Sequence, residues 1–386
     1  MRLVTRALSL ALVPALALGL AACGDDENGA PEAGASTPAA APLAVTPADK
    51  QAAVPVSAEI GADEKLTQVT LTDAQGAAVE GELREDGSSW VPADPLSYDT
   101  TYTVNATAGE RTATTTFSTM SRPENRMDAQ IFMSEGRTYG QAMPVVVEFG
   151  QGGVAEADRA AVEKRLFVKS DPPQPGVWHW DSAIQVEYRP QAYWQPGTKL
   201  TVRLGLGGLP VGQDRYGKVD VDLTASIDTK RREITVDNAT KKLIATEDGK
   251  EVKSLPVSLG KTDAPSYSGT MVIVERLDKT TFDSSTYGVP ASSADGYRTD
   301  VQFAERLTWS GQFIHAAPWS DADQGRRNVS HGCVNVSNDG GKWVFEWTRV
   351  GDPVVIKGTE QKLPTGDGWT AWNLSWEDFQ AGSALR

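Results

Sequence analysis

Short β-favouring runs separated by turn signals fill the chain from about residue 48 to residue 120. Two such runs, QVTLT at 68–72 and TYTVN at 101–105, alternate with turn-forming pairs such as those at 86–87 and 108–109. Short runs that recur between glycine-containing turns are typical of an antiparallel β-sandwich. We therefore predict a small sandwich over residues 48–120.

A weaker copy of this pattern returns further along the chain. KLTVR at 199–203 follows a Pro-Gly turn, and ASIDT at 225–229 echoes TTFST at 115–119. We predict a second sandwich over residues 121–229, so that two modules of immunoglobulin type stand in tandem.

The second predicted module contains three consecutive large side chains, Trp178, His179 and Trp180. Exposed aromatic rings stack well on sugars, so a sugar-binding platform is one interpretation. Alternation along a strand instead places both tryptophans on one face, and that face is most often the core. We expect both tryptophans to be buried and His179 to point to solvent.

Denser strand patterns continue over residues 230–357, where hairpin signals indicate a β-rich domain. One helix is predicted inside this domain, from about Asn338 to Arg349, with Ser337 or Asn338 as its N-cap. The fold class is therefore mainly β, with one or two helices.

The tail at residues 358–386 is marked by three tryptophans. They follow one another at intervals of three and four residues, which suits one face of a helix; they are Trp369, Trp372 and Trp376. We expect this tail to pack against the rest of the protein rather than to bind sugars.

The first 22 residues have the layout of a cleaved secretory signal, with a basic start, an apolar run and small residues before Cys23. The segment LAAC at 20–23 resembles the lipobox of bacterial lipoproteins, which implies that Cys23 is lipidated and anchors the protein to a membrane. An ordinary signal peptide with an incidental cysteine is the alternative. Residues 23–47 are mostly Ala, Pro, Gly and acidic residues, so we expect a flexible linker.

Charge and cysteine usage narrow the range of partners. The chain has 37 basic and 51 acidic side chains and a formal net charge of −14, so it will not bind nucleic acid non-specifically. Only two cysteines occur, which argues against a disulfide framework. Of the three histidines, His315 and His331 lie close to Cys333 in sequence. This co-location is the first sign of a reactive site.

Cys333 is a candidate nucleophile because a histidine precedes it at a defined spacing. A thiol attacks carbonyl carbon as the thiolate, so it needs a neighbouring base, which an imidazole supplies. His315 ends a predicted strand, and 14 residues separate it from the segment SHGCVN at 330–335. Gly332 allows the backbone to approach a substrate, and amides around Gly332 and Cys333 are suited to stabilise an oxyanion.

Two other interpretations compete with a catalytic one. His315, His331 and Cys333 are possible zinc ligands, but a structural zinc site needs four ligands and no further cysteine or histidine is nearby. A single cysteine is also often a buried structural residue. We predict neither a metal nor a cofactor.

The histidine and the SHGCVN segment together resemble the signature of the L,D-transpeptidase (YkuD) catalytic domain. Three further segments, STYGVP at 285–290, GYRTD at 296–300 and HAAPWS at 315–320, resemble the actinobacterial, mycobacterial-type members of that family. Those members combine a lipoprotein-like start, two immunoglobulin-like modules, the catalytic domain and a C-terminal extension. The resemblance covers nearly the whole chain.

The resemblance implies a role for each matching residue. Cys333 is the nucleophile, His315 is its base, and the backbone carbonyl of Ala316 holds the imidazole. Relatives often have serine in place of Ala316, but only the carbonyl is used. His331 and Gly332 frame the oxyanion hole with Cys333. The implied substrate-binding residues lie around the cleft and on a mobile lid: Tyr287, Tyr297, Ser310, Gly311, Trp319, Ser330 and Asn335.

The resemblance also implies the reaction and the partners. A peptidoglycan tetrapeptide stem acylates Cys333 and releases D-alanine, and a second stem resolves the thioester into a 3→3 cross-link. Carbapenems are the implied inhibitors. An L,D-carboxypeptidase that uses water as acceptor and a non-catalytic wall-binding spacer are the alternatives. We expect a monomer that is lipid-anchored outside the cytoplasm and reaches into the cell wall.

Overall fold

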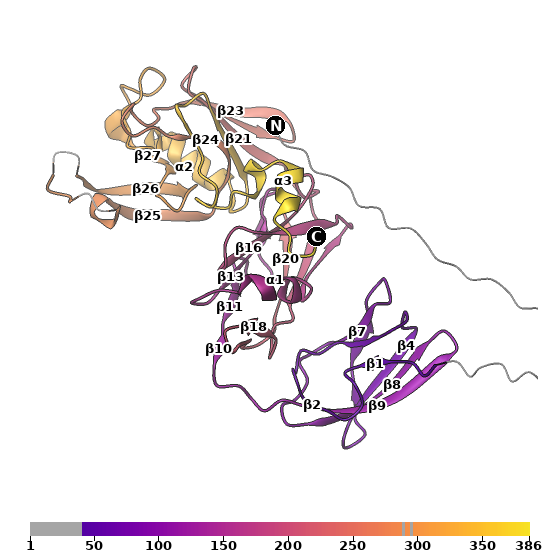
Figure 1. Ribbon diagram of the computed structural model, residues 1–386. Coiled ribbons are helices and arrows are strands. Elements are labelled where there is room, and N and C mark those ends of the chain that lie inside the picture. The colour runs from indigo at the N-terminus through magenta and orange to yellow at the C-terminus, as the bar shows by residue number, and fades with distance from the viewer. Residues whose placement is uncertain (1–40, 288–289, 294–295) are drawn as a thin grey trace, which may run out of the picture. The chain divides into compact units, whose positions relative to one another are not determined.

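The structure is a computed structural model that describes residues 41–287, 290–293 and 296–386 (Figure 1). The predicted signal peptide, Cys23 and most of the linker lie outside the described residues, so lipidation stays a prediction. No helix in the described part of the chain is long and apolar enough to cross a membrane.

The first module is a sandwich of two sheets. One has four strands in the order β1 (Val45–Thr46), β3 (Ile60–Ala62), β7 (Ser89–Pro92) and β6 (Gly81–Leu83). The other has five, in the order β2 (Gln51–Val54), β9 (Arg111–Thr119), β8 (Thr101–Ala108), β4 (Gln68–Asp73) and β5 (Ala78–Val79). Every second residue of β8 is buried, because alternate side chains face the core. The runs predicted as strands are β4 and β8.

The second module is also a sandwich, as predicted. Its main sheets are β11 (Ala129–Ile131), β13 (Val145–Phe149), β16 (Gln185–Pro190) and β15 (Gly176–Trp180), and β12 (Thr138–Tyr139), β20 (Val221–Ile227), β17 (Lys199–Leu204) and β14 (Leu166–Asp171). A small third sheet holds β10 (Arg126–Met127), β19 (Arg215–Gly217) and β18 (Pro210–Gly212), and helix α1 spans Glu156–Glu163.

Trp178 and Trp180 are buried in this module as predicted. The expectation that His179 points to solvent is wrong. Its ring stacks on Phe379 at 4.9 Å between centroids, and its Nδ1 lies 2.8 Å from the Phe379 carbonyl. The C-terminal tail covers this strand face, and strand alternation carries no information about a segment 200 residues away.

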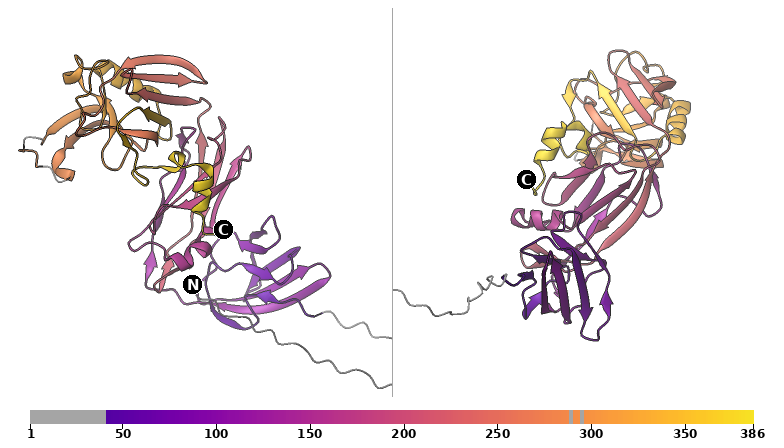
Figure 2. Two further views of the ribbon diagram at one scale, coloured as in Figure 1. Left: turned by 45° about the horizontal axis from the view of Figure 1, so that its top comes forward. Right: turned by 90° about the vertical axis from the view of Figure 1, so that its right-hand side faces the viewer.

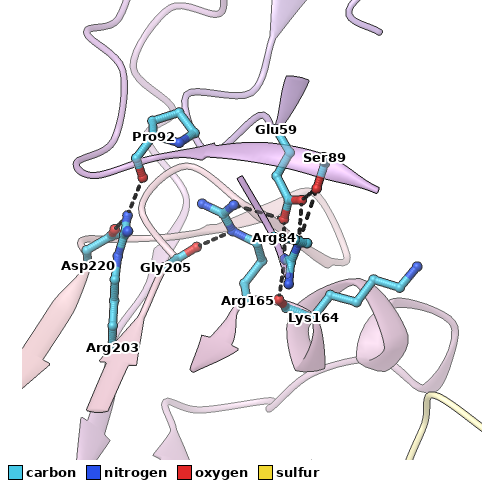
Figure 3. Close-up of polar contacts among 9 residues, drawn as sticks. All are labelled: Glu59, Arg84, Ser89, Pro92, Lys164, Arg165, Arg203, Gly205 and Asp220. Atoms are coloured by element: carbon cyan, nitrogen blue, oxygen red, sulfur yellow. Dashed lines mark hydrogen bonds and ion pairs between the residues drawn. The ribbon is translucent and has the colours of Figure 1, made fainter. Parts of the chain in front are cut away.

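A cluster of ion pairs joins the two sandwiches (Figure 3). The carboxylate of Glu59 accepts hydrogen bonds from Arg84 at 2.6 Å and from Arg165 of the second module at 3.0 Å. Burial raises the pKa of Glu59, but the bonds from Arg84, Ser89 and Arg165 outweigh it and lower the pKa to about 2. The contact between the two sandwiches therefore contains the ionised Glu59 carboxylate between the guanidinium groups of Arg84 and Arg165.

The last domain is built from two sheets and a helix. Six strands run in the order β23 (Lys250–Pro256), β22 (Lys242–Glu247), β21 (Arg232–Asp237), β29 (Pro353–Lys357), β24 (Tyr267–Val272) and β30 (Gln361–Lys362). Four more run in the order β25 (Glu275–Asp283), β26 (Arg298–Arg306), β27 (Phe313–Ala316) and β28 (Val334–Val336), and short 3₁₀ turns η1 and η2 span Ser284–Tyr287 and Pro318–Ser320.

Helix α2 (Asn338–Trp347) confirms the helix prediction, although it ends two residues earlier than expected. Ser337 caps it by accepting a hydrogen bond from the Gly340 amide at 3.1 Å. Val344 is buried on its inner face. The helix begins five residues after Cys333, directly after β28 and the Ser337 cap.

The tail packs against the second sandwich, as predicted, but its three tryptophans do not share a helix. Trp372 lies in the 3₁₀ turn η3 (Ala371–Asn373) and Trp376 opens a separate helix, α3 (Trp376–Ala381), because Leu374 is extended and Ser375 caps the new helix. Trp369 is 2% exposed, and the Trp372 indole donates to the Ala142 carbonyl. Figures 1 and 2 show the tail in yellow beside the second module.

Candidate active site

Two parallel strands bring the predicted histidine and cysteine together. β27 and β28 are hydrogen-bonded neighbours in which Ile314 pairs with Val334 and His315 pairs with Asn335. Ile314 and Val334 are buried in the core, so apolar packing fixes the register of both strands. Cys333 directly precedes Val334, so it lies beside Phe313 at the start of β27, two residues before His315, and both Cys333 and His315 line one cavity. Both side chains are nearly enclosed, with exposures of 8% for Cys333 and 3% for His315.

The tautomer of His315 follows from its hydrogen bond. Its Nδ1 lies 2.9 Å from the carbonyl oxygen of Ala316. A carbonyl oxygen only accepts, so Nδ1 carries the proton and a neutral ring has Nε2 as its proton acceptor. The backbone of Ala316 therefore does what the resemblance implies, without a side-chain hydroxyl.

Burial sets the charge state of both groups. It lowers the pKa of His315 to about 4, although the Ala316 carbonyl and the Asn335 side chain act in the opposite direction. Burial also raises the pKa of the Cys333 thiol to about 12, against the Phe313 amide and the charge of Arg306. The resting site at neutral pH therefore contains a thiol and a neutral imidazole, not a preformed thiolate.

The loop that carries Cys333 is tightly hydrogen-bonded. Ser330 Oγ donates to the Cys333 carbonyl at 2.7 Å and accepts from the Gly332 amide at 3.2 Å. Ser266 Oγ donates to the Gly332 carbonyl at 2.7 Å. Gly332 has φ +119°, a backbone conformation that favours glycine, and a Cβ there would lie 3.1 Å from Nε2 of the Gln312 side chain. The hydroxyl of Ser330 therefore holds the loop that carries Cys333, and Ser330 also lines the cavity.

A cavity of about 360 Å³ opens over these residues. Its lining combines seven residues singled out from the sequence with five that were not: Tyr297, His315, Trp319, Ser330, His331, Cys333 and Asn335, and Phe282, Thr299, Val301, Ser320 and Val329. Thr299 and Val301 lie two residues apart on β26, and the strand period of two, counted from Tyr297, would have found them. No local sequence pattern predicts that Phe282 belongs to the cavity. Its ring meets the ring of His315 edge to face, with 5.0 Å between the centroids.

Comparison with known proteins identifies the family. Residues 231–356 match the L,D-transpeptidase catalytic domain, and residues 47–210 match a bacterial Ig domain. L,D-transpeptidase 2 of Mycobacterium tuberculosis is 35% identical over 392 residues, which cover 98% of this chain and 95% of that protein. The chain belongs to the L,D-transpeptidase family.

Two further relatives of this L,D-transpeptidase agree with that assignment. L,D-transpeptidase 5 of Mycobacterium tuberculosis is 32% identical over 366 residues, covering 90% of this chain and 78% of the relative. The structure of the L,D-transpeptidase LdtMt1 in complex with imipenem is 30% identical with a TM-score of 0.51, and covers 59% of this chain and 97% of that one.

Two predicted aromatic residues of this L,D-transpeptidase, Trp319 and Tyr297, line the cavity. Trp319 is 58% exposed and its ring centroid lies 6.0 Å from that of His315. The ring of Tyr297 meets the ring of His331 at 5.2 Å. Tyr287 ends η1, and its side chain lies outside the described part of the structure.

Ser310 and Gly311 lie in the turn between β26 and β27. The thiol of Cys333 points to the Gly311 carbonyl, with sulfur and oxygen 3.7 Å apart. Ser310 is exposed and is bound by Asp367 of the tail. No local pattern in the sequence connects Asp367 with this site.

Proposed function

We propose that this protein cross-links peptidoglycan by L,D-transpeptidation, with Cys333 as nucleophile and His315 as the base that activates it. The observation that carries the proposal is the parallel pairing of β27 with β28, which brings Cys333 and His315 to the wall of one cavity while Nδ1 is committed to the Ala316 carbonyl. Nε2 is thus the ring nitrogen able to take a proton. The family assignment supports the same chemistry.

In the first half-reaction, His315 accepts the thiol proton as sulfur attacks the carbonyl of the third stem residue, a meso-diaminopimelate in this family's donors. Because the resting pair is neutral, this transfer accompanies attack. The tetrahedral oxyanion lies near the amides of Gly332 and Cys333. The carbon–nitrogen bond to the terminal D-alanine then breaks, and its nitrogen takes the proton back from His315. A thioester remains on Cys333.

In the second half-reaction, a side-chain amine of another stem attacks the thioester. His315 takes the proton that the amine loses and returns it to the sulfur as the carbon–sulfur bond breaks. The products are a 3→3 cross-link and free Cys333. The neutral imidazole at rest suits both steps, because it must gain and lose one proton in each.

For its location, we propose a lipid anchor at Cys23 that holds the enzyme outside the cytoplasm. Support comes from the LAAC segment and the apolar run before it. Growth of cells that express the full chain with a radiolabelled fatty acid should label the wild type and leave Cys23→Ala unlabelled. Label on both proteins would contradict the anchor.

The central test is incubation of the full chain and its Cys333→Ala variant with a disaccharide-tetrapeptide, with products separated by mass. The wild type should form a dimer that has lost one D-alanine, and the variant should form none while it keeps its thermal unfolding profile. Hydrolysed tripeptide without dimer would instead assign an L,D-carboxypeptidase. Dimer formation by Cys333→Ala would refute the nucleophile, and no product from the wild type would favour a non-catalytic spacer.

A further inference from the structure

The turn between β26 and β27 supplies the polar groups nearest to the Cys333 sulfur. The Gly311 carbonyl accepts from the thiol at 3.7 Å, and the Phe313 amide favours the ionised sulfur. A carbonyl beside the sulfur stabilises the thiol, whereas an amide stabilises the thiolate. The backbone position of residues 310–313 therefore sets the electrostatic potential at the Cys333 sulfur.

Gln312 is held firmly in this turn, because its carbonyl accepts from the Leu307 amide at 2.9 Å and its side chain accepts from the Tyr267 amide at 2.9 Å. Gly311 has fewer contacts. The Gly311 amide donates to the Thr308 carbonyl at 3.3 Å, and the Gln312 amide donates to Thr308 Oγ1 at 3.0 Å. Gly311 has φ +99°, and a Cβ built there would meet no described atom within 4 Å. Gly311 is thus placed by its neighbours in the turn rather than by packing around it.

The C-terminal tail provides an anchor from outside the turn. One oxygen of the Asp367 carboxylate accepts from the Ser310 amide at 2.7 Å, and the other accepts from the Ser310 hydroxyl at 2.5 Å. Bonds to an ionised carboxylate are stronger than bonds between neutral groups. The two hydrogen bonds from Ser310 to Asp367 fix both the backbone and the side chain of Ser310.

The tail is itself held by the two residues that follow Asp367. Gly368 has φ +105°, and a Cβ there would lie 2.7 Å from the Leu307 carbonyl, so the tail backbone lies directly against the end of β26. Trp369 is buried, and its ring contacts Phe132 at 5.9 Å and Trp309 at 6.3 Å. The carboxylate thus approaches Ser310 from a rigid support.

We propose that Asp367 is a positioning residue of the acyl transfer, which fixes Ser310 and thereby holds the Gly311 carbonyl and the Phe313 amide in place around the Cys333 sulfur. The inference rests on the proposed role of Cys333 as nucleophile. It assigns part of the tail to the control of thiol reactivity, in addition to its packing on the second sandwich.

Three variants of the full chain separate geometry from charge. Asp367→Ala removes both acceptors from Ser310. Asp367→Asn keeps one oxygen for the Ser310 amide and offers a donor to its hydroxyl oxygen, but has no charge. Asp378→Asn is the control, because Asp378 lies in the same tail and its carboxylate also accepts from a serine hydroxyl, that of Ser375.

The rate of imipenem acylation and the pH profile of iodoacetamide alkylation should be measured on the peptide that contains Cys333, by mass spectrometry. We expect Asp367→Ala to slow acylation about 10- to 100-fold and to move the alkylation midpoint, since a displacement near 1 Å costs this much. Asp367→Asn should stay within about threefold of wild type, and Asp378→Asn should be unchanged.

Wild-type rates and an unchanged pH profile in Asp367→Ala would overturn the inference. Equal losses in Asp367→Asn and Asp367→Ala would also overturn it, because charge rather than position would then be responsible. If Asp367→Ala fails to fold, Ser310→Ala decides. It loses the hydroxyl bond to Asp367 but keeps the amide bond, so we expect partly slowed alkylation, and a wild-type rate would refute positioning. Failure of the proposed function would appear separately, as absence of imipenem on Cys333 in the wild type.

Discussion

Lowering the pH from 8 to 5 should leave the rate of Cys333 acylation by imipenem almost unchanged. Burial lowers the pKa of His315 to about 4, so the imidazole stays neutral and able to accept a proton over this range. A histidine with an ordinary pKa of about 6.5 would be about 97% protonated at pH 5, and the rate would fall about thirtyfold. The expected loss at pH 5 is about 10%, and the rate should halve near pH 4.

The same reasoning predicts a steep pH dependence once the base is removed. Burial raises the pKa of Cys333 to about 12, so only about one thiol in 100,000 is ionised at pH 7. In His315→Ala no general base takes the proton of the Cys333 thiol, so the attacking thiolate must form by ionisation in solution. Its acylation rate should therefore rise about tenfold for each pH unit between 7 and 10.

The assay is rapid mixing with imipenem followed by intact mass, with the adduct assigned to the peptide that contains Cys333 so that Cys23 does not contribute. His179→Gln is the control, since this histidine lies in the second sandwich. An acid midpoint near 6.5 in the wild type would show that burial does not set the pKa of His315. A plateau below pH 9 in His315→Ala would refute the same reasoning for Cys333.

Three further perturbations test the packing that supports the site. Arg189→Ala should destabilise the tail by about 2–4 kcal/mol, because the guanidinium donates to tail carbonyls and lies 4.4 Å from the Phe379 ring centroid; urea denaturation with limited proteolysis measures this. Glu59→Gln should cost about 1–3 kcal/mol at pH 7 by thermal unfolding. Its folded pKa is depressed, so the contribution of Glu59 is complete above about pH 4.5 and disappears as the pH falls towards 2. Ser337→Ala should cost about 1 kcal/mol through loss of the cap of α2.

Each of these has a contrary outcome. Unchanged protease sensitivity of the tail in Arg189→Ala would mean that aromatic packing alone holds it. A Glu59→Gln deficit that persists at pH 2 would show that its ion pairs are not the cause. A Ser337→Gly variant should lose only a few tenths of a kcal/mol relative to wild type, and a larger loss would point away from capping.

The features that depend on local periodicity were predictable. Alternation and turn spacing were sufficient for both sandwiches, and the run from Ser337 to Trp347 carried a cap and a helical stripe. The motif was sufficient to predict that His315 and Cys333 lie in one site. The structure adds that the strands next to them, β27 and β28, are parallel neighbours.

The misses at His179 and Ser310 involve contacts between distant segments, whereas the break between η3 and α3 in the tail is local, at Leu374 and Ser375. His179 is covered by Phe379, and Ser310 is bound by Asp367, yet neither residue of either pair carries a local signal of its partner. The depressed pKa of His315 belongs to the same class, because burial comes from the whole domain rather than from its neighbours in sequence.

The most direct test of the central claim is the mass of the peptide that contains Cys333 after the full chain is mixed with the tetrapeptide donor and quenched in acid. The account predicts a thioester adduct equal to the donor minus D-alanine, present in the wild type, absent in Cys333→Ala and lost when an acceptor stem is added. Cross-linked product without any adduct on Cys333, or an adduct on another residue, would contradict it.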